Sequence, residues 1–274
     1  MRNIVQKPLP EKFKYEQIVE QFLVDALNDN YDFYRNLLVD AAKEYSDKTK
    51  LPLALHEIEQ RKGQYKEVVG YYTDQIVNGD LRFIYDIIRS SSIRCPHCGC
   101  SKVTCLDHYL PKEKFPLFSI YPKNLIPTCK DCNEAKGTYA SNDYKESLLN
   151  PYFDDLYSTK WLGARVSSYN PICIEFFVLE NILSVDDTNR AKIYMKKLKL
   201  QDTFESSALD EISGILWSLK EFLADSDTQS VKDHLCERAE SWSKHSINCW
   251  QRALYEGLSI DEYFCSDYLN TVDA

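Results

Sequence analysis

Four cysteines in two closely spaced pairs form the pattern with the most specific chemistry in this sequence. Cys95 and Cys98 are separated by two residues, and so are Cys129 and Cys132. Each pair suits a tight turn that points two sulfur atoms at one ion, and two such turns complete the tetrahedral shell that a structural zinc ion prefers. We therefore predict that these four cysteines bind a structural Zn²⁺.

The other cysteines support metal binding less directly. Six of the ten cysteines lie between Cys95 and Cys132, and paired cysteines in a reducing compartment are metal ligands or buried thiols more often than disulfides. Gly99, directly after Cys98, suits a turn that requires a positive φ. The further sulfur and imidazole groups of this stretch belong to His97, Cys100 and Cys105. His97 could replace a thiolate in principle, but packing or surface roles are the ordinary interpretation of all three.

Between the cysteine pairs, a β-favouring run carries a carboxylate beside an imidazole, at Asp107 and His108. A second short β-favouring run begins at Asn124, and Asn133 stands where Cys129–Lys136 is expected to turn into a helix. Hydrolysis of a phosphodiester requires an activated water, neutralised phosphate charge and help for the departing oxygen. Neutral imidazole is a suitable general base near pH 7, and carboxylate and amide oxygens are hard ligands for Mg²⁺ or Mn²⁺. These residue types therefore point to metal-assisted phosphodiester hydrolysis.

The strings DHYLPK at 107–112 and NLIPTCKDCNEAK at 124–136 resemble the HNH, or ββα-metal, endonuclease family. The four cysteines resemble the zinc-braced subgroup of that family. The resemblance covers about 40 residues, or about 55 with Asn150–Asp154 included. It implies a β-hairpin and a helix that hold one divalent cation and cut a phosphodiester to leave 5′-phosphate and 3′-hydroxyl ends.

The resemblance also implies a role for each residue of the site. His108 is the general base, and Asp107 and Asn133 bind the catalytic Mg²⁺ or Mn²⁺. Asn124 fixes the hairpin loop and orients His108 without touching substrate. Lys136, one helical turn beyond Asn133, is expected to bind a phosphate of the substrate. The motif that names the family has histidine where this sequence has Asn133, and the harder amide oxygen favours Mg²⁺ or Mn²⁺ over softer metals.

Each of these residues also has an ordinary structural interpretation. An isolated Asp–His pair is usually structural, asparagines suit turns and caps, and Lys136 suits a solvated surface. The order of residue types within one short stretch favours a catalytic site, with DNA as the first candidate substrate. Two alternatives stay open: a zinc-dependent module that binds nucleic acid or protein without cleavage, and an HNH nuclease directed at RNA.

The elements that must position these residues divide the chain into three regions. Residues 1–92 carry apolar side chains at helical spacing and predict a helical N-terminal region. Residues 93–155 are rich in proline and cysteine and predict short strands and loops in a zinc-braced nuclease module. Residues 156–274 show strand-like alternation at Ile172–Phe176 and then helical spacing. We therefore predict an α+β fold, a mainly helical protein with an inserted ββα-metal module.

Charge and composition indicate which partners and which cellular location to expect. The net charge is −9, yet residues 94–136 carry seven basic and four acidic side chains, a balance of +3 that leaves −12 for the rest. This distribution argues against an open, non-specific nucleic-acid binder but permits nucleic acid at the site. The N-terminus has no apolar signal region, and no stretch of about 18 apolar residues occurs, so we expect a cytoplasmic protein without membrane contact.

The layout of the whole chain resembles stand-alone HNH nucleases of prokaryotic antiphage defence systems of the Septu type. In such systems a nuclease of this kind works beside an ATPase. The resemblance therefore implies an ATPase or another regulatory protein as a partner. Poor intrinsic affinity for DNA, in keeping with the acidic balance outside the motif, would then restrain the isolated chain.

Overall fold

The computed structural model describes residues 18–19, 31–45 and 65–271, which form two compact units. One unit contains residues 18–19, 31–45, 65–96 and 101–153, and the other contains residues 97–100 and 154–271. The helical prediction for the remaining residues of 1–92 lies outside the described residues. The division into three regions stays a prediction.

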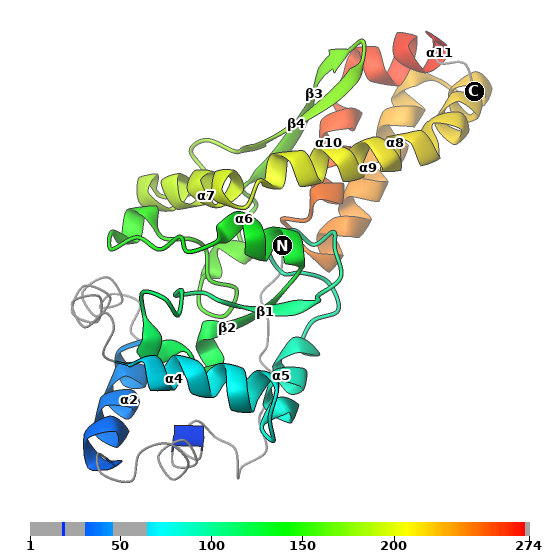
Figure 1. The fold of residues 1–274 in the computed structure, drawn as a ribbon. Helices are drawn as coiled ribbons and strands as arrows, with labels where there is room; N and C mark the ends of the chain where they lie inside the picture. The colour runs from blue at the N-terminus through cyan, green and yellow to red at the C-terminus, as the bar shows by residue number, and fades with distance from the viewer. Residues whose placement is uncertain (1–17, 20–30, 46–64, 272–274) are drawn as a thin grey trace. The chain divides into compact units, whose positions relative to one another are not determined.

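The predicted α+β class is confirmed. Helices predominate in the described part of the chain, and its strands form two separate two-stranded antiparallel sheets (Figure 1). None of the described helices has the combination of length and apolarity that crossing a membrane requires.

Helices before residue 90 supply the apolar support of the first unit. They are α2 (Tyr31–Tyr45), α4 (Lys66–Tyr71) and α5 (Arg82–Arg89). A π-helical turn, η2 (Tyr72–Val77), continues α4 without a break. Val68, Tyr72 and Ile76 are buried and recur every four residues, so they share one face. Only glycine fits at position 79, just after this turn, because a Cβ atom there would lie 2.4 Å from the carbonyl oxygen of Asp74.

The second half of this unit is a short hairpin followed by a helix. The hairpin consists of β1 (Cys105–His108) and β2 (Leu125–Thr128), and the helix is α6 (Lys130–Lys136). Strand register sets Asp107 opposite Ile126 and His108 opposite Leu125. Three short 3₁₀ turns occupy the connecting loops: η3 (Pro116–Phe118), η4 (Pro122–Asn124) and η5 (Tyr144–Glu146). This order of strand, strand and helix agrees with the elements predicted from the sequence.

The other unit consists of one hairpin and a set of helices. Its elements are η6 (Asp155–Tyr157), β3 (Leu162–Tyr169), β4 (Ile172–Val178), α7 (Val185–Lys197), α8 (Leu200–Asp225), α9 (Thr228–His245), α10 (Trp250–Ser259), η7 (Phe264–Tyr268) and α11 (Leu269–Thr271). The strand predicted at Ile172–Phe176 is confirmed by β4. Ile174, Phe176 and Val178 are buried in alternation with half-buried neighbours, as a strand with one covered face requires.

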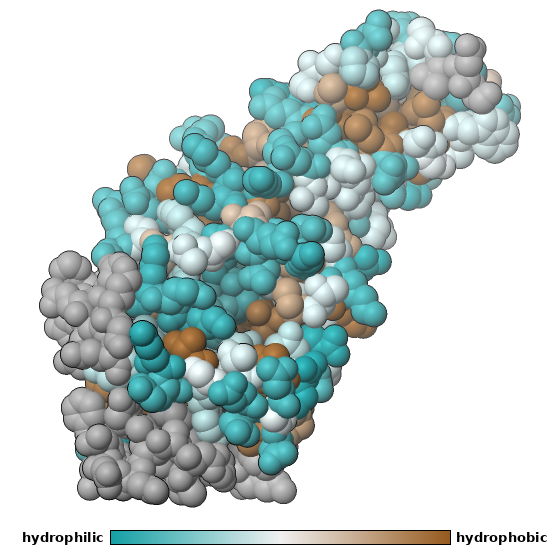
Figure 2. Space-filling view, viewed as in Figure 1, coloured by the Kyte–Doolittle hydropathy of each residue, from teal (hydrophilic) through white to brown (hydrophobic). Residues whose placement is uncertain are grey.

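Helices cover this hairpin from two sides. The edge of β4 is closed by α8, because Gln201 and Glu205 accept hydrogen bonds from the backbone N–H groups of Phe176 and Ile174. α10 packs closely against β3, since a Cβ atom on Gly257 would lie 2.3 Å from the carbonyl oxygen of Ala164 (Figure 1). The visible surface is mostly hydrophilic and carries scattered hydrophobic patches (Figure 2).

Candidate active site and metal centre

The four predicted zinc ligands come together in the structure. The sulfur atoms of Cys95, Cys98, Cys129 and Cys132 all lie within 4.8 Å of one another, and all four residues are buried. Thiolates around one tetrahedral Zn²⁺ have sulfur atoms about 3.8 Å apart, so this cluster could hold a zinc ion with only small adjustments. Among the described residues, no other group of three or more histidine, cysteine or acidic side chains brings its ligand atoms so close together.

Local backbone geometry prepares both cysteine pairs for a metal. Gly99 has a φ of 72°, as its place in the first turn predicts. The N–H of Cys132 donates to Sγ of Cys129 at 3.4 Å, and this contact also caps the first turn of α6. The hydroxyl of Thr128 lies 3.3 Å from Sγ of Cys95. Such contacts orient sulfur ligands and moderate their charge.

His97, Cys100 and Cys105 have other contacts. Nδ1 of His97 lies 2.8 Å from the hydroxyl of Tyr194, and that imidazole is buried. The thiol of Cys100 donates to the carbonyl of Cys98 at 3.4 Å, and the thiol of Cys105 donates to the carbonyl of Thr128 at 3.6 Å. All three therefore take the packing roles that the sequence favours.

A second site lies on the hairpin. A cavity of about 350 Å³ is lined by Asp107 and His108 from the end of β1 and by Asn133 from α6. The sequence pattern predicts that these three residues share one site, and the structure brings them to one cavity. Tyr72, Lys112 and Glu113 also line it.

His108 is held in one tautomer by the loop that follows β1. Its Nε2 lies 3.0 Å from the carbonyl oxygen of Ser119. A carbonyl only accepts hydrogen bonds, so Nε2 carries the proton and Nδ1 keeps its lone pair. Burial lowers the pKa of His108 to about 3, with the Ser119 bond opposing and the charges of Lys112 and Lys136 reinforcing the shift. The imidazole is therefore neutral at pH 7, with the lone pair of Nδ1 unprotonated.

Asp107 is paired with a buried lysine. Nζ of Lys136 donates to Oδ1 of Asp107 at 2.9 Å and to the carbonyl oxygen of His108 at 2.6 Å. Burial raises the pKa of Asp107 to about 6, although the Lys136 ammonium opposes the shift. Lys136 is only 4% exposed, and both hydrogen bonds of its ammonium end on residues of β1. Its ammonium is therefore buried against β1 and not solvated, and the phosphate contact of Lys136 stays a prediction.

The fully buried side chain of Asn124 makes three hydrogen bonds within the loop between the strands and one with Tyr45 of α2. Its Oδ1 accepts from the N–H of Leu110 at 2.8 Å and from the hydroxyl of Tyr45 at 3.0 Å. Its Nδ2 donates to the carbonyls of Leu110 at 3.0 Å and Phe118 at 3.1 Å. Phe118 directly precedes Ser119, so the same network fixes the carbonyl that orients His108. The side chain thus joins both ends of the loop and faces no substrate.

The cavity is lined by oxygen atoms of the chemical type that binds a hard divalent cation. Asp107 offers a carboxylate, Asn133 an amide oxygen, and Glu113 lines the same cavity. Mg²⁺ and Mn²⁺ take such oxygen ligands, and Mg²⁺ commonly binds one or two carboxylates and several waters. Asp107 and Asn133 are the residues that would hold such an ion.

Sequence reasoning missed Tyr72 as part of this cavity. Its ring packs edge-on against the His108 imidazole, with centroids 4.5 Å apart. Tyr72 precedes the motif by more than thirty residues, and no local pattern connects it to His108. Lys112 lies within the DHYLPK string, and its positive charge is evident from the sequence, but the motif gives this residue no role.

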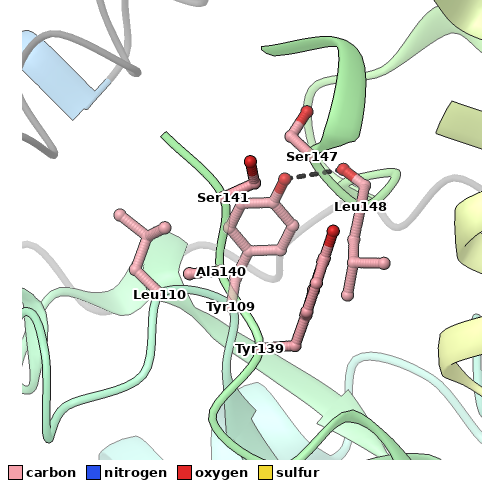
Figure 3. Close-up of a pocket in the computed structure, with 7 residues that line it drawn as sticks. All are labelled: Tyr109, Leu110, Tyr139, Ala140, Ser141, Ser147 and Leu148. Carbon is pink, nitrogen blue, oxygen red and sulfur yellow. Dashed lines mark hydrogen bonds between the residues drawn. The ribbon is translucent and has the colours of Figure 1, made fainter. Parts of the chain in front are cut away.

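A smaller pocket beside the hairpin is unsuited to a substrate. It is lined by Tyr109, Tyr139 and Leu148 among others, and the Tyr109 hydroxyl donates to the carbonyl of Leu148 at 2.6 Å (Figure 3). Its volume of about 20 Å³ is enough for about one water molecule. The 350 Å³ cavity is therefore the better candidate for chemistry.

Comparison with known proteins gives two partial similarities. The chain is 29% identical to protein ea31 of Escherichia phage lambda over 203 residues, which cover 68% of this chain and 69% of ea31. It is 37% identical to the Septu protein PtuB of Bacillus thuringiensis over 73 residues, 25% of this chain and 28% of PtuB. No family model matches the chain, and no solved structure matches it. The similarity to a Septu protein and the four-cysteine cluster agree with the expected resemblance to Septu-type defence proteins.

Proposed function

We propose that this chain is a metal-dependent endonuclease of the HNH type that hydrolyses phosphodiester bonds, with DNA as its substrate. One observation carries the proposal. A neutral His108, with its proton on Nε2, lines one cavity together with Asp107 and Asn133. A binding module has no need for a base and two hard metal ligands in one cavity.

His108 is the proton acceptor in the proposed reaction. Nδ1 takes a proton from the attacking water as the water oxygen bonds to phosphorus, and the bond from phosphorus to the 3′-oxygen breaks. The 3′-oxygen leaves with a proton from solvent, which gives 3′-hydroxyl and 5′-phosphate ends. The Ser119 carbonyl stabilises the positive charge that develops on the imidazole. A divalent cation on Asp107 and Asn133 would neutralise phosphate charge.

The similarity to two known proteins suggests a biological role. Partial similarity to PtuB supports an effector role in antiphage defence, and the longer similarity is to a phage protein. We propose that a protein partner, an ATPase in Septu-type systems, controls cleavage. The acidic balance outside residues 94–136 supports this, because an acidic protein binds DNA weakly by itself.

Cleavage of supercoiled plasmid tests the proposal. The zinc-loaded wild type and His108→Ala are compared with Mg²⁺, with Mn²⁺ and without either. We expect metal-dependent nicking or linearisation by the wild type and its loss in His108→Ala, with zinc content unchanged. A folded, zinc-loaded wild type that cuts neither DNA nor RNA by itself would favour control by the proposed partner or the binding module, and absence of cleavage with the partner added as well would favour the binding module. Cleavage of RNA alone would correct the substrate and retain the mechanism.

A further inference from the structure

The ring of Tyr72 contacts two functional groups of the cavity at once. Its edge meets the His108 imidazole, with centroids 4.5 Å apart. Nζ of Lys112 lies over the same ring, 5.3 Å from its centroid. Tyr72 belongs to η2, outside the hairpin and α6, so a separate helix places a proton acceptor and a cation side by side.

Lys112 and Lys136 differ in what surrounds their charges. Lys136 is buried and neutralised by Asp107, whereas Lys112 is half-buried on the cavity wall. Within the described residues Lys112 has no ion pair, although Glu113 lines the same cavity. A lysine without an acidic partner is available to an anionic ligand. The face of the Tyr72 ring stabilises the charge of Lys112 through a cation–π contact and limits the rotamers of the lysine side chain.

The backbone at Tyr72 is also unusual. α4 ends at Tyr71, and the chain continues as a π-helical turn. π-Helical turns are rare, and they occur frequently at functional sites because they change the direction in which a side chain projects. Burial raises the pKa of Tyr72, and nearby Asp107 contributes to that shift, so the hydroxyl stays protonated. Tyr72 is therefore an uncharged wall beside both groups.

We propose that Lys112 forms a phosphate-binding subsite beside His108 and that Tyr72 positions both groups. The ligand is a backbone phosphate of the nucleic acid, adjacent to the bond that is cut. The subsite rests on the proposed nuclease function, and it takes the role that the sequence pattern assigns to Lys136. Lys112 touches substrate, and Tyr72 acts through Lys112 and His108.

The test measures binding without cleavage. Zinc-loaded protein without added Mg²⁺ or Mn²⁺ is titrated with fluorescent DNA and RNA duplexes of one sequence, over a range of salt concentrations. Loss of one phosphate contact on duplex DNA reduces the slope of log K against log salt by about 0.9. We expect this reduction for Lys112→Gln and none for Lys114→Gln. Lys114 is the matched control, two residues further on and absent from the cavity wall.

Tyr72 variants separate positioning from folding. Tyr72→Phe keeps the ring and should bind the duplexes like the wild type. Tyr72→Leu should reduce the slope of log K against log salt by the same amount as Lys112→Gln. The double variant should lose no more than either single one. NMR signals of the His108 ring protons provide a second readout, because Tyr72→Leu removes a ring-current shift that Tyr72→Phe retains. Unchanged zinc content confirms that each variant is folded.

The outcomes distinguish this subsite from the nuclease itself. Equal salt slopes for Lys112→Gln and Lys114→Gln would overturn the subsite, and plasmid cleavage by the wild type would leave the nuclease standing. A slope loss in a protein that cleaves neither alone nor with the proposed partner added would support the subsite and refute the nuclease. Unchanged binding and unchanged His108 signals in Tyr72→Leu would remove Tyr72 from the proposal.

Discussion

Asp107 and His108 should oppose each other in the pH dependence of stability. The pKa of Asp107 rises from 3.8 to about 6 on folding, and the pKa of His108 falls from 6.5 to about 3. Between about pH 3.8 and 6 the unfolded chain therefore carries one proton on His108, and the folded chain carries one on Asp107. The two states bind equal numbers of protons at this pair, so its contribution to stability is independent of pH.

Removing either residue exposes the dependence of the other. In His108→Ala, only the folded state holds a proton, on Asp107, so stability should fall with rising pH by about 1.4 kcal/mol per unit relative to the wild type. In Asp107→Asn, only the unfolded state holds a proton, on His108, so stability should rise with pH by about the same amount. The two variants thus change in opposite directions over the same pH range.

Hydrogen exchange of the β1 and β2 amides measures this locally. All four tryptophans lie after residue 160, so intrinsic fluorescence would report the other unit. Opening free energies are compared at about pH 4.8 and about pH 5.8, after correction for intrinsic exchange rates and without added Mg²⁺. Other titrating groups affect all three proteins alike and cancel in the difference. Parallel pH dependence in the wild type and both variants would refute the reasoning.

Two further variants test the scaffold of the site. Asn124→Ala removes four hydrogen bonds at a fully buried position and should destabilise the hairpin by about 3–5 kcal/mol, measured by the same exchange. Asn78→Ala, which removes one exposed hydrogen bond, should cost less than about 1 kcal/mol, and equal losses would contradict the role of Asn124. Cys129→Ser should lose zinc and unfold the hairpin, whereas Cys236→Ser, at an exposed thiol outside the cluster, should retain zinc in elemental analysis. A folded and active Cys129→Ser protein would show that the cluster is misread.

The local pattern of the motif was enough to predict the hairpin, the helix and the sulfur cluster. Cys95, Cys98, Cys129 and Cys132 signal their function through spacing, because a metal requires several ligands of one type at short range. The run before His108 is rich in β-favouring residue types, which a single sequence displays. Chemistry confined to neighbouring residues is therefore readable from the sequence.

Tertiary contacts were not predictable in the same way. Tyr72 reaches His108 from a different helix, and no periodicity relates the two. Lysine is a residue type that usually lies on the surface, but the side chain of Lys136 is buried in an ion pair with Asp107. Burial of a charged pair depends on how two elements pack, and the sequence of either element does not specify this. The same limitation explains why Lys112 carried no assigned role in the motif.

The zinc cluster and the cavity are connected through one helix. Cys129 and Cys132 flank the first turn of α6, and Asn133 and Lys136 lie on the residues that follow. A zinc ion bound to the cluster would therefore fix the start of the helix that carries a proposed metal ligand and the cation paired with Asp107. Asn124 fixes the loop whose Ser119 carbonyl orients His108. Loss of zinc should thus disturb Asp107 and Asn133 first, while loss of Asn124 should disturb His108 first, although either change abolishes the same proposed reaction.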